Sequence, residues 1–132
     1  MASARFRRRQ RISGDTQFGR IRQEGVAAGD GLLYVRSLPN GLGFARLGLA
    51  VGRAAGGAVA RSRLRRQIRE AFRACQAELP PGLDLLVGPR GGAAGAGPEK
   101  LRRSLTSLAA RVAAELGKRP GGTPQGGNGG GR

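Results

Sequence analysis

Residues 58–79 constrain the fold of this chain more than any other part of its sequence. At about 100° per residue, their apolar side chains fall within one arc of a helix about 100° wide. These side chains are Leu64, Ile68, Ala71, Phe72, Cys75 and Leu79. The arc predicts a helix that packs on a sheet, and the Pro-Pro-Gly run at residues 80–82 ends it.

The opposite side of that helix is rich in arginine. The arginines on this side and at the helix start are Arg61, Arg63, Arg65, Arg66, Arg69 and Arg73, and Glu70 is the only acid among them. Like charges one turn apart repel, and solvated helix faces usually mix signs. A guanidinium binds phosphate through two parallel hydrogen bonds and stacks on bases. The pattern therefore favours a polyanion-binding face over a merely solvated one.

The composition indicates the same class of partner. The 132 residues include 24 Lys and Arg against 8 Asp and Glu, which gives a formal net charge of +16. Such a field attracts polyanions, with nucleic acid as the leading partner and an anionic membrane surface as the second. The sequence has no histidine, which excludes a Ser-His-Asp triad, a histidine metal site and an imidazole general base.

Two further features bear on compartment and ligands. The single cysteine, Cys75, cannot form an internal disulfide or a Cys₄ zinc site, which predicts a reducing, cytoplasmic compartment. No apolar run approaches the roughly 20 residues of a membrane span, so no membrane-spanning segment is expected. With nucleic acid as the leading partner, we expect no membrane partner. Gly52 and Gly57 have P-loop spacing, but residues 58–59 are Ala-Val where Lys-Ser/Thr is required. We therefore expect no ATP and no small-molecule substrate.

The residues before the central helix show weaker patterns. Ser13 and Asp15 can cap a short helix that ends at Gly25. Residues 33–36 alternate apolar and polar side chains, and residues 44–51 are a second strand region. These patterns predict one helix and two strands ahead of the central helix.

The remaining residues complete one domain. Residues 83–87 (LDLLV) predict a buried strand, and Pro98 begins a last helix whose apolar stripe extends to Leu116. Residues 1–12 form a basic arm with too few apolar side chains to define a face, and we expect it to be mobile when free. Residues 117–132 are rich in Gly and predict a disordered tail. Residues 13–116 are left as a single folded domain.

An ordered set of motifs resembles the bacterial ribonuclease P protein component. Its centre is the run RLGLAV at residues 46–51, followed by G-x-AV-x-RSRLRR-x-IREAFR at residues 56–73. The match extends upstream to F-x-x-I-x-x-x-G at residues 18–25 and downstream to DLLV-x-x-R at residues 84–90. It covers roughly residues 5–116 in the family's order and spacing.

The resemblance implies a fold that the local patterns predict only in part. It implies an α/β (α+β) two-layer sandwich of order α-β-β-β-α-β-α with a four-stranded sheet. The local patterns place only two strands before the central helix. The resemblance also implies a left-handed β-α-β crossover, against the usual right-handed rule.

The activity that the resemblance implies is removal of the 5′ leader from precursor tRNA. In the family an RNA subunit is the catalyst and holds the Mg²⁺ ions that serve phosphodiester hydrolysis. The protein binds this ribonuclease P RNA and the single-stranded leader, and it raises substrate and metal affinity. No catalytic residue and no metal ligand is expected in the protein, in keeping with three aspartates and no histidine.

The resemblance also assigns residues to two binding surfaces. The surface for the catalytic RNA comprises Arg53, Arg61, Arg63, Arg65, Arg66, Arg69 and Arg73. The cleft for the 5′ leader comprises Phe18, Arg22, Arg36 and Ser62. Plain core packing is the alternative for Phe18, because buried phenylalanine is common.

Several positions depart from the family pattern. Ser62 stands where the family has asparagine, so a shorter hydroxyl replaces an amide. Arg22 and Arg36 stand at positions that are often aromatic, and a guanidinium can still stack on a base while adding charge. Tyr34 lies two residues away from the expected aromatic position. Binding in the cleft should therefore depend more on electrostatics.

Two other functions compete with this one. A ribosomal or RNA-chaperone-type protein could use the same basic helix without a nuclease partner. A protein-only nuclease is disfavoured, because the chain has few acids and no histidine.

Overall fold

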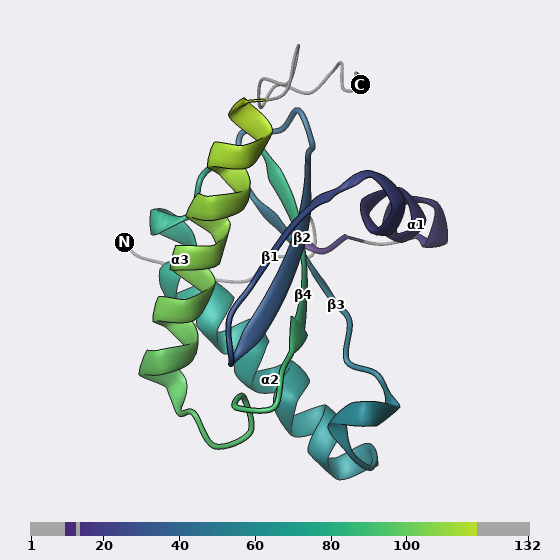
Figure 1. The fold of residues 1–132 in the computed structure, drawn as a ribbon, viewed down its shortest axis with the longest axis vertical. Helices are drawn as coiled ribbons and strands as arrows, with labels where there is room; N and C mark the ends of the chain where they lie inside the picture. Colours follow the sequence, from purple (N-terminus) through teal and green to yellow (C-terminus); the bar gives the residue numbers. More distant parts are fainter. Residues whose placement is uncertain (1–9, 13, 119–132) are drawn as a thin grey trace.

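The computed structural model describes residues 10–12 and 14–118. Its helices are α1 (Asp15–Glu24), α2 (Ala58–Cys75) and α3 (Pro98–Gly117), and its strands are β1 (Val26–Gly29), β2 (Leu33–Pro39), β3 (Arg46–Leu49) and β4 (Leu83–Pro89). Short 3₁₀ turns at Arg53–Ala55 and Gln76–Glu78 flank α2. The order α-β-β-β-α-β-α is confirmed (Figure 1).

The four strands form one mixed sheet in the order β1-β2-β4-β3. The β1/β2 and β2/β4 pairs are antiparallel, and β3 and β4 are parallel. The parallel pair is joined through α2, as a crossover requires. The hand of this crossover stays a prediction of the resemblance.

Helices α2 and α3 cover one face of the sheet, and α1 lies on the other side (Figure 1). The apolar arc predicted for the central helix is buried there, in one core with the odd-numbered side chains of β2 and β4. The members from α2 and the turn after it are Leu64, Ile68, Ala71, Phe72, Cys75 and Leu79. Burial raises the pKa of the Cys75 thiol, so this cysteine is a protonated, unreactive core residue.

A smaller apolar cluster lies beneath α1 on the opposite face. Its buried members are Ile12, Ile21, Leu38 and Leu86, with Phe18 and Ala50 packed against them. Because α1 is short, it covers only part of this face, and the polar side chains of β2 beyond it face outward. The uncovered part of the sheet is where a second binding surface can form.

The strand that the local patterns did not predict is β1. Its sequence, VAAG, contains a single large apolar side chain, too little to show a strand period. The strand is held by pairing with β2, from Val26 opposite Ser37 to Gly29 opposite Tyr34. The second strand region is also shorter than residues 44–51, because β3 pairs with β4 only over Arg46–Leu49.

The boundary of the basic arm differs from the prediction. Ile12, assigned to the arm, is only 5% exposed, and its N–H donates to the carbonyl of Leu47 at 2.9 Å. Gln10 donates a side-chain hydrogen bond to Gln76. Residues 10–12 therefore belong to the folded part, while the rest of the arm, the cap expected at Ser13 and residues 119–132 of the tail lie outside the described residues. Gly14 precedes α1, and no side chain of the described residues caps that helix.

Candidate nucleic-acid interface

The arginine-rich side of α2 faces away from the core. Its six arginines, Arg61, Arg63, Arg65, Arg66, Arg69 and Arg73, are exposed or half-buried. In the part of the chain that the structure describes, none of them forms an ion pair. The Nε atom of Arg61 is buried, with no acceptor among the described residues. This side of α2 therefore presents uncompensated positive charge to a polyanion.

A glycine-rich loop leads into the start of α2. Gly56 has φ 124°, a conformation that favours glycine, and no side chain caps the N–H groups that follow Gly57. Arg53 lies exposed in the 3₁₀ turn before these glycines. The uncapped N–H groups carry the positive end of the helix dipole. Arg53 thus lies at the same end of α2 as Arg61.

Three of the residues predicted for the leader cleft lie together. The Phe18 ring packs on Gly48 of β3, where an added Cβ would come within 2.9 Å of the ring. The Arg22 guanidinium lies 6.0 Å from the centroid of that ring. Arg36 donates from Nη1 to the backbone carbonyl of Arg22 at 3.3 Å. The ring is only half-buried, so Phe18 is both a packing residue and an accessible one.

Arg69 connects the arginine side of α2 with this cleft. It lines a cavity of about 220 Å³ together with Arg11, Ile12 and Gly48. Gly48 is the residue on which the Phe18 ring lies. A polyanion bound along α2 can therefore continue around the edge of β3 into the cleft.

Ser62 is not in contact with the other cleft residues. It is exposed, and it lies seven residues before Arg69 on α2. Residues separated by seven positions share one side of a helix. Ser62 therefore lies on the same side of α2 as Arg69, nearer the start of the helix.

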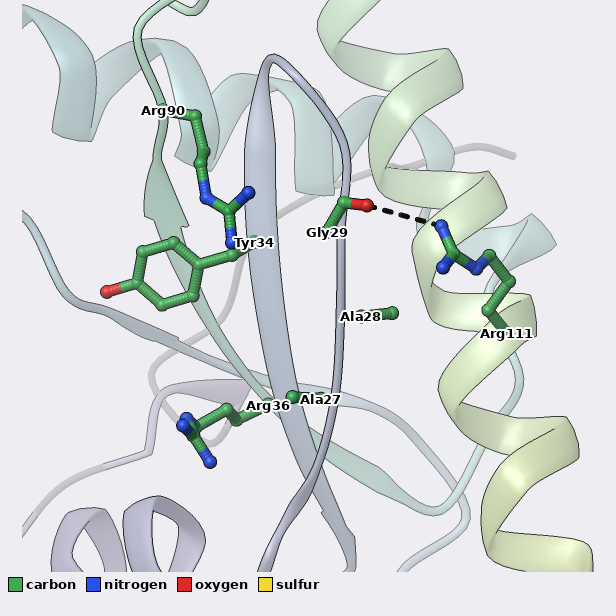
Figure 2. Close-up of a pocket in the computed structure, with 7 residues that line it drawn as sticks. All are labelled: Ala27, Ala28, Gly29, Tyr34, Arg36, Arg90 and Arg111. Atoms are coloured by element: carbon green, nitrogen blue, oxygen red, sulfur yellow. Dashed lines mark hydrogen bonds between the residues drawn. The ribbon is translucent and has the colours of Figure 1, made fainter.

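Tyr34, Arg90 and Arg111 form a group that the sequence interpretation did not assign to the site. Figure 2 shows Tyr34 and Arg90 on the same side of β2, with Arg36 further along the strand and Arg111 reaching from α3 to the far side of β1. The Arg90 guanidinium lies 5.7 Å from the Tyr34 ring centroid. The signal that could have found them is the pairing register, because it brings Gly29, Tyr34 and Gly88 into one row.

A family model for ribonuclease P matches residues 6–113 of the chain. The chain belongs to the ribonuclease P protein family. The ribonuclease P protein component of Roseiflexus castenholzii is 35% identical over 81 residues, which are 61% of this chain and 66% of that protein. That of Thermotoga petrophila is 38% identical over 85 residues, which are 64% of this chain and 73% of that protein.

Solved structures of ribonuclease P proteins have the same fold. The protein from Thermotoga maritima superposes with a TM-score of 0.71 at 30% identity, covering 77% of this chain and 96% of that one. The protein from Staphylococcus aureus gives a TM-score of 0.66 at 27% identity, covering 78% of this chain and 96% of that one. These likenesses confirm the recognised family and the predicted fold class.

Two carboxylates of this chain, those of Asp30 and Asp84, make structural hydrogen bonds. Asp84 accepts hydrogen bonds from the side chains of Arg46 and Asn40. The hydrogen bond between Asp84 and Arg46 raises the pKa of the Arg46 guanidinium. Asp30 accepts hydrogen bonds from the N–H groups of Leu33 and Leu32. Burial acts to raise the pKa of Asp30, but these bonds, one from Ser104 and the nearby Arg111 lower it on balance. No three acidic, cysteine or histidine side chains gather into a possible metal site within the described residues.

The helices of the described residues give no membrane-crossing segment. None of them is both long enough and apolar enough to span a bilayer.

Proposed function

We propose that this chain is the RNA-binding protein subunit of a ribonuclease P that removes the 5′ leader from precursor tRNA. The observation that carries the proposal is the continuity between two surfaces. An unpaired arginine face on α2 meets a cleft with a ring and two arginines, and Arg69 lies at the junction. A protein that must hold a folded RNA and a single strand at once needs these two kinds of surface side by side.

The arginine face supplies the contact with the catalytic RNA. Arginine forks bind phosphate with fixed geometry, which suits a folded RNA more than a flexible one. We assign to this contact Arg53, Arg61, Arg63, Arg65, Arg66, Arg69 and Arg73. Their common position on one side of α2 and its preceding loop supports the assignment.

The cleft between α1 and the sheet supplies the contact with the leader. A base can stack on the exposed part of the Phe18 ring, which is worth about 1–3 kcal/mol per base and tolerates any sequence. Arg22 stands beside the ring, and Arg36 donates to the backbone carbonyl of Arg22. From there their guanidinium groups can reach both bases and phosphates. We assign Ser62 to the same RNA strand, because it shares the side of α2 on which Arg69 lies.

The chain itself takes no chemical role in this proposal. Asp30 and Asp84 are engaged in structural hydrogen bonds, and the described residues gather no set of metal ligands. In keeping with this, we assign the Mg²⁺ of phosphodiester hydrolysis to the RNA subunit. The protein's contribution is to bind and orient the substrate, which raises the affinity for substrate and metal. The free thiol of Cys75 suits the cytoplasm as the place of action.

Reconstitution tests the proposal directly. The purified chain is mixed with a bacterial ribonuclease P RNA and precursor tRNA at a magnesium concentration where the RNA alone is slow. We expect a gain in 5′ processing that needs both the RNA and the protein. Tight RNA binding without any gain in processing would contradict the proposal and favour an RNA-chaperone role. Cleavage by the protein alone would instead show a protein-only nuclease.

A further inference from the structure

One row of the sheet has an aromatic residue between two glycines. The register places Gly29 of β1 opposite Tyr34 of β2, and Tyr34 opposite Gly88 of β4. Side chains in such a row point to the same face of the sheet. This is the face that α1 covers only in part, so the glycines leave room on both sides of the tyrosine.

The Tyr34 ring and the Arg90 guanidinium occupy that room. A Cβ added at Gly88 would meet the Cε2, Cζ and hydroxyl atoms of Tyr34, so the ring lies directly on the backbone of β4. A Cβ added at Gly29 would lie 2.9 Å from Nη2 of Arg90, so the guanidinium lies on the backbone of β1. The two planar groups are neighbours, at 5.7 Å from guanidinium carbon to ring centroid. We call these two adjacent planar groups the platform.

Positive charge surrounds this platform. A groove of about 670 Å³ is lined by Tyr34 with Arg36, Arg90 and Arg111, and its described lining contains no acid. Arg111 reaches it from α3 and donates from Nη1 to the carbonyl of Gly29 at 3.3 Å (Figure 2). The nearby Asp30 is held by Leu32, Leu33 and Ser104. The groove thus combines a stacking surface with cations from three elements.

The platform repeats the arrangement at Phe18. There, too, a ring lies on a glycine, Gly48, with an arginine beside it. Gly48 pairs with Leu86, two residues before Gly88 on the adjacent strand. From ordinary strand rise and spacing, the two glycines are about 8 Å apart. One short single-stranded segment can reach both.

We propose that Tyr34 and Arg90 form a second stacking site for single-stranded RNA, with Arg111 and Arg36 holding its phosphates. The inference rests on the proposed function, and its occupant is the more distant part of the 5′ leader. In this proposal the RNA enters beside α2 at the β3 edge of the sheet. It crosses Phe18 and then Tyr34, and it leaves over β1 at Arg111. Since the catalytic RNA binds at α2, nucleotides over β1 are the ones further from the cleaved bond.

Tyrosine fluorescence tests the contact without the catalytic RNA. Tyr34 is the only tyrosine and the chain has no tryptophan, so all tyrosine emission comes from the proposed site. We titrate the full chain with a dye-labelled single-stranded RNA, following binding by anisotropy and Tyr34 emission after absorbance correction. Stacking should quench the emission as the RNA binds. Emission that stays constant while the anisotropy rises would overturn the proposal.

Leader length tests the role in the holoenzyme. Reconstituted enzyme carrying Tyr34→Leu is compared with Tyr34→Phe on precursor tRNAs whose leaders are shortened one nucleotide at a time. Tyr34→Leu should weaken binding of long-leader substrates about fivefold to a hundredfold, the range that one stacked base supplies. It should leave the shortest leaders unaffected, and Tyr34→Phe should retain affinity. An equal loss at every leader length, or none, would overturn the inference.

Arg111 is tested with a charge-matched control on the same helix. Arg111→Ala should reduce affinity only for long leaders, whereas Arg103→Ala, at an exposed arginine outside the groove, should not. Equal effects of the two substitutions would show general electrostatics in place of a site. Absence of any processing gain with the unaltered protein would contradict the proposed function. The fluorescence titration would still decide separately whether single-stranded RNA stacks on Tyr34.

Discussion

The guanidinium of Arg46 forms two hydrogen bonds of 2.7 Å with the carboxylate of Asp84, across the parallel pair β3 and β4. Asp84 also accepts a hydrogen bond from Asn40 at 3.0 Å, which ties the turn after β2 to the same point. The Arg46 and Asp84 side chains are 17% and 7% exposed. This ion pair fastens the edge strand β3, and with it Gly48 and the cleft, to the centre of the sheet.

Replacing Asp84 should therefore destabilise the fold. Asp84→Asn removes the negative charge that the half-buried Arg46 bonds through two nitrogens, and removing one partner of a buried pair costs about 3–5 kcal/mol. We expect a loss toward the lower end, since Arg46 keeps some contact with water. Urea unfolding of the free protein measures the change. Glu78→Gln, at an exposed acid, is the control, and equal stability of the two variants would show that the pair is unimportant.

Gly48 should tolerate no larger residue. In Gly48→Ala the new Cβ would lie 2.9 Å from Cε1 of Phe18 and 3.2 Å from Cδ1 of Ile12. Overpacking of this kind costs about 1–3 kcal/mol, and a displaced ring should also weaken leader binding. Gly43→Ala is the matched control, because nothing lies within 4 Å of a Cβ there. Unfolding free energy and precursor affinity would be measured together, and unchanged values for Gly48→Ala would refute the close contact.

The arginine face of α2 should determine how RNA binding depends on salt. Each phosphate contact that is lost lowers the slope of log affinity against log salt by about 0.7–0.9. We expect Arg65→Ala and Arg69→Ala each to weaken binding of ribonuclease P RNA and to flatten this slope. Arg103→Ala, which removes the same charge from α3, should leave the slope nearly unchanged. A slope that none of the three variants alters would mean that the α2 face is only solvated.

Asp30 should make the stability depend on acid pH. Its pKa is lowered in the folded protein from an ordinary value of 3.8, so the folded state favours the charged form. The stability it contributes is complete above that ordinary value and is lost as the pH falls through the lowered one. Asp30→Asn should therefore lose stability near neutral pH but show a smaller further loss on acidification to about pH 3. Urea midpoints at the two pH values check this, and parallel losses in both proteins would contradict it.

The sequence predicts α2 and its two faces well, because the pattern lies within one helix and repeats every turn. The residues of the α2 arc are buried as its period requires, from Leu64 to Cys75. The strand β1 escapes such reasoning, since VAAG has no period and is held by its partner β2. Ile12 escapes it too, because its burial depends on the bridge between its neighbour Arg11 and Leu47 and on its own backbone hydrogen bond to Leu47, far along the chain.

The candidate site divides in the same way. Phe18, Arg22 and Arg36 could be grouped from motif positions, and the structure has Arg22 in contact with both of the others. Their role at the leader stays a prediction. Tyr34 departs from the family's spacing, and its surroundings depend on the register of three strands. Only the pairing of Gly29, Tyr34 and Gly88 shows that its ring has glycine backbone to lie on.

The pairing of Arg11 with Leu47 and the bond from Arg111 to Gly29 lie at the two opposite edges of the sheet. Exposed strand edges are templates for self-association, and proteins block them with short strands, charges or added segments. Here residues 10–12 lie along the β3 edge, where Arg11 pairs with Leu47. The other edge is the short strand β1, where the Arg111 side chain bonds the carbonyl of Gly29. We therefore expect neither edge to pair with the sheet of a second copy of the chain.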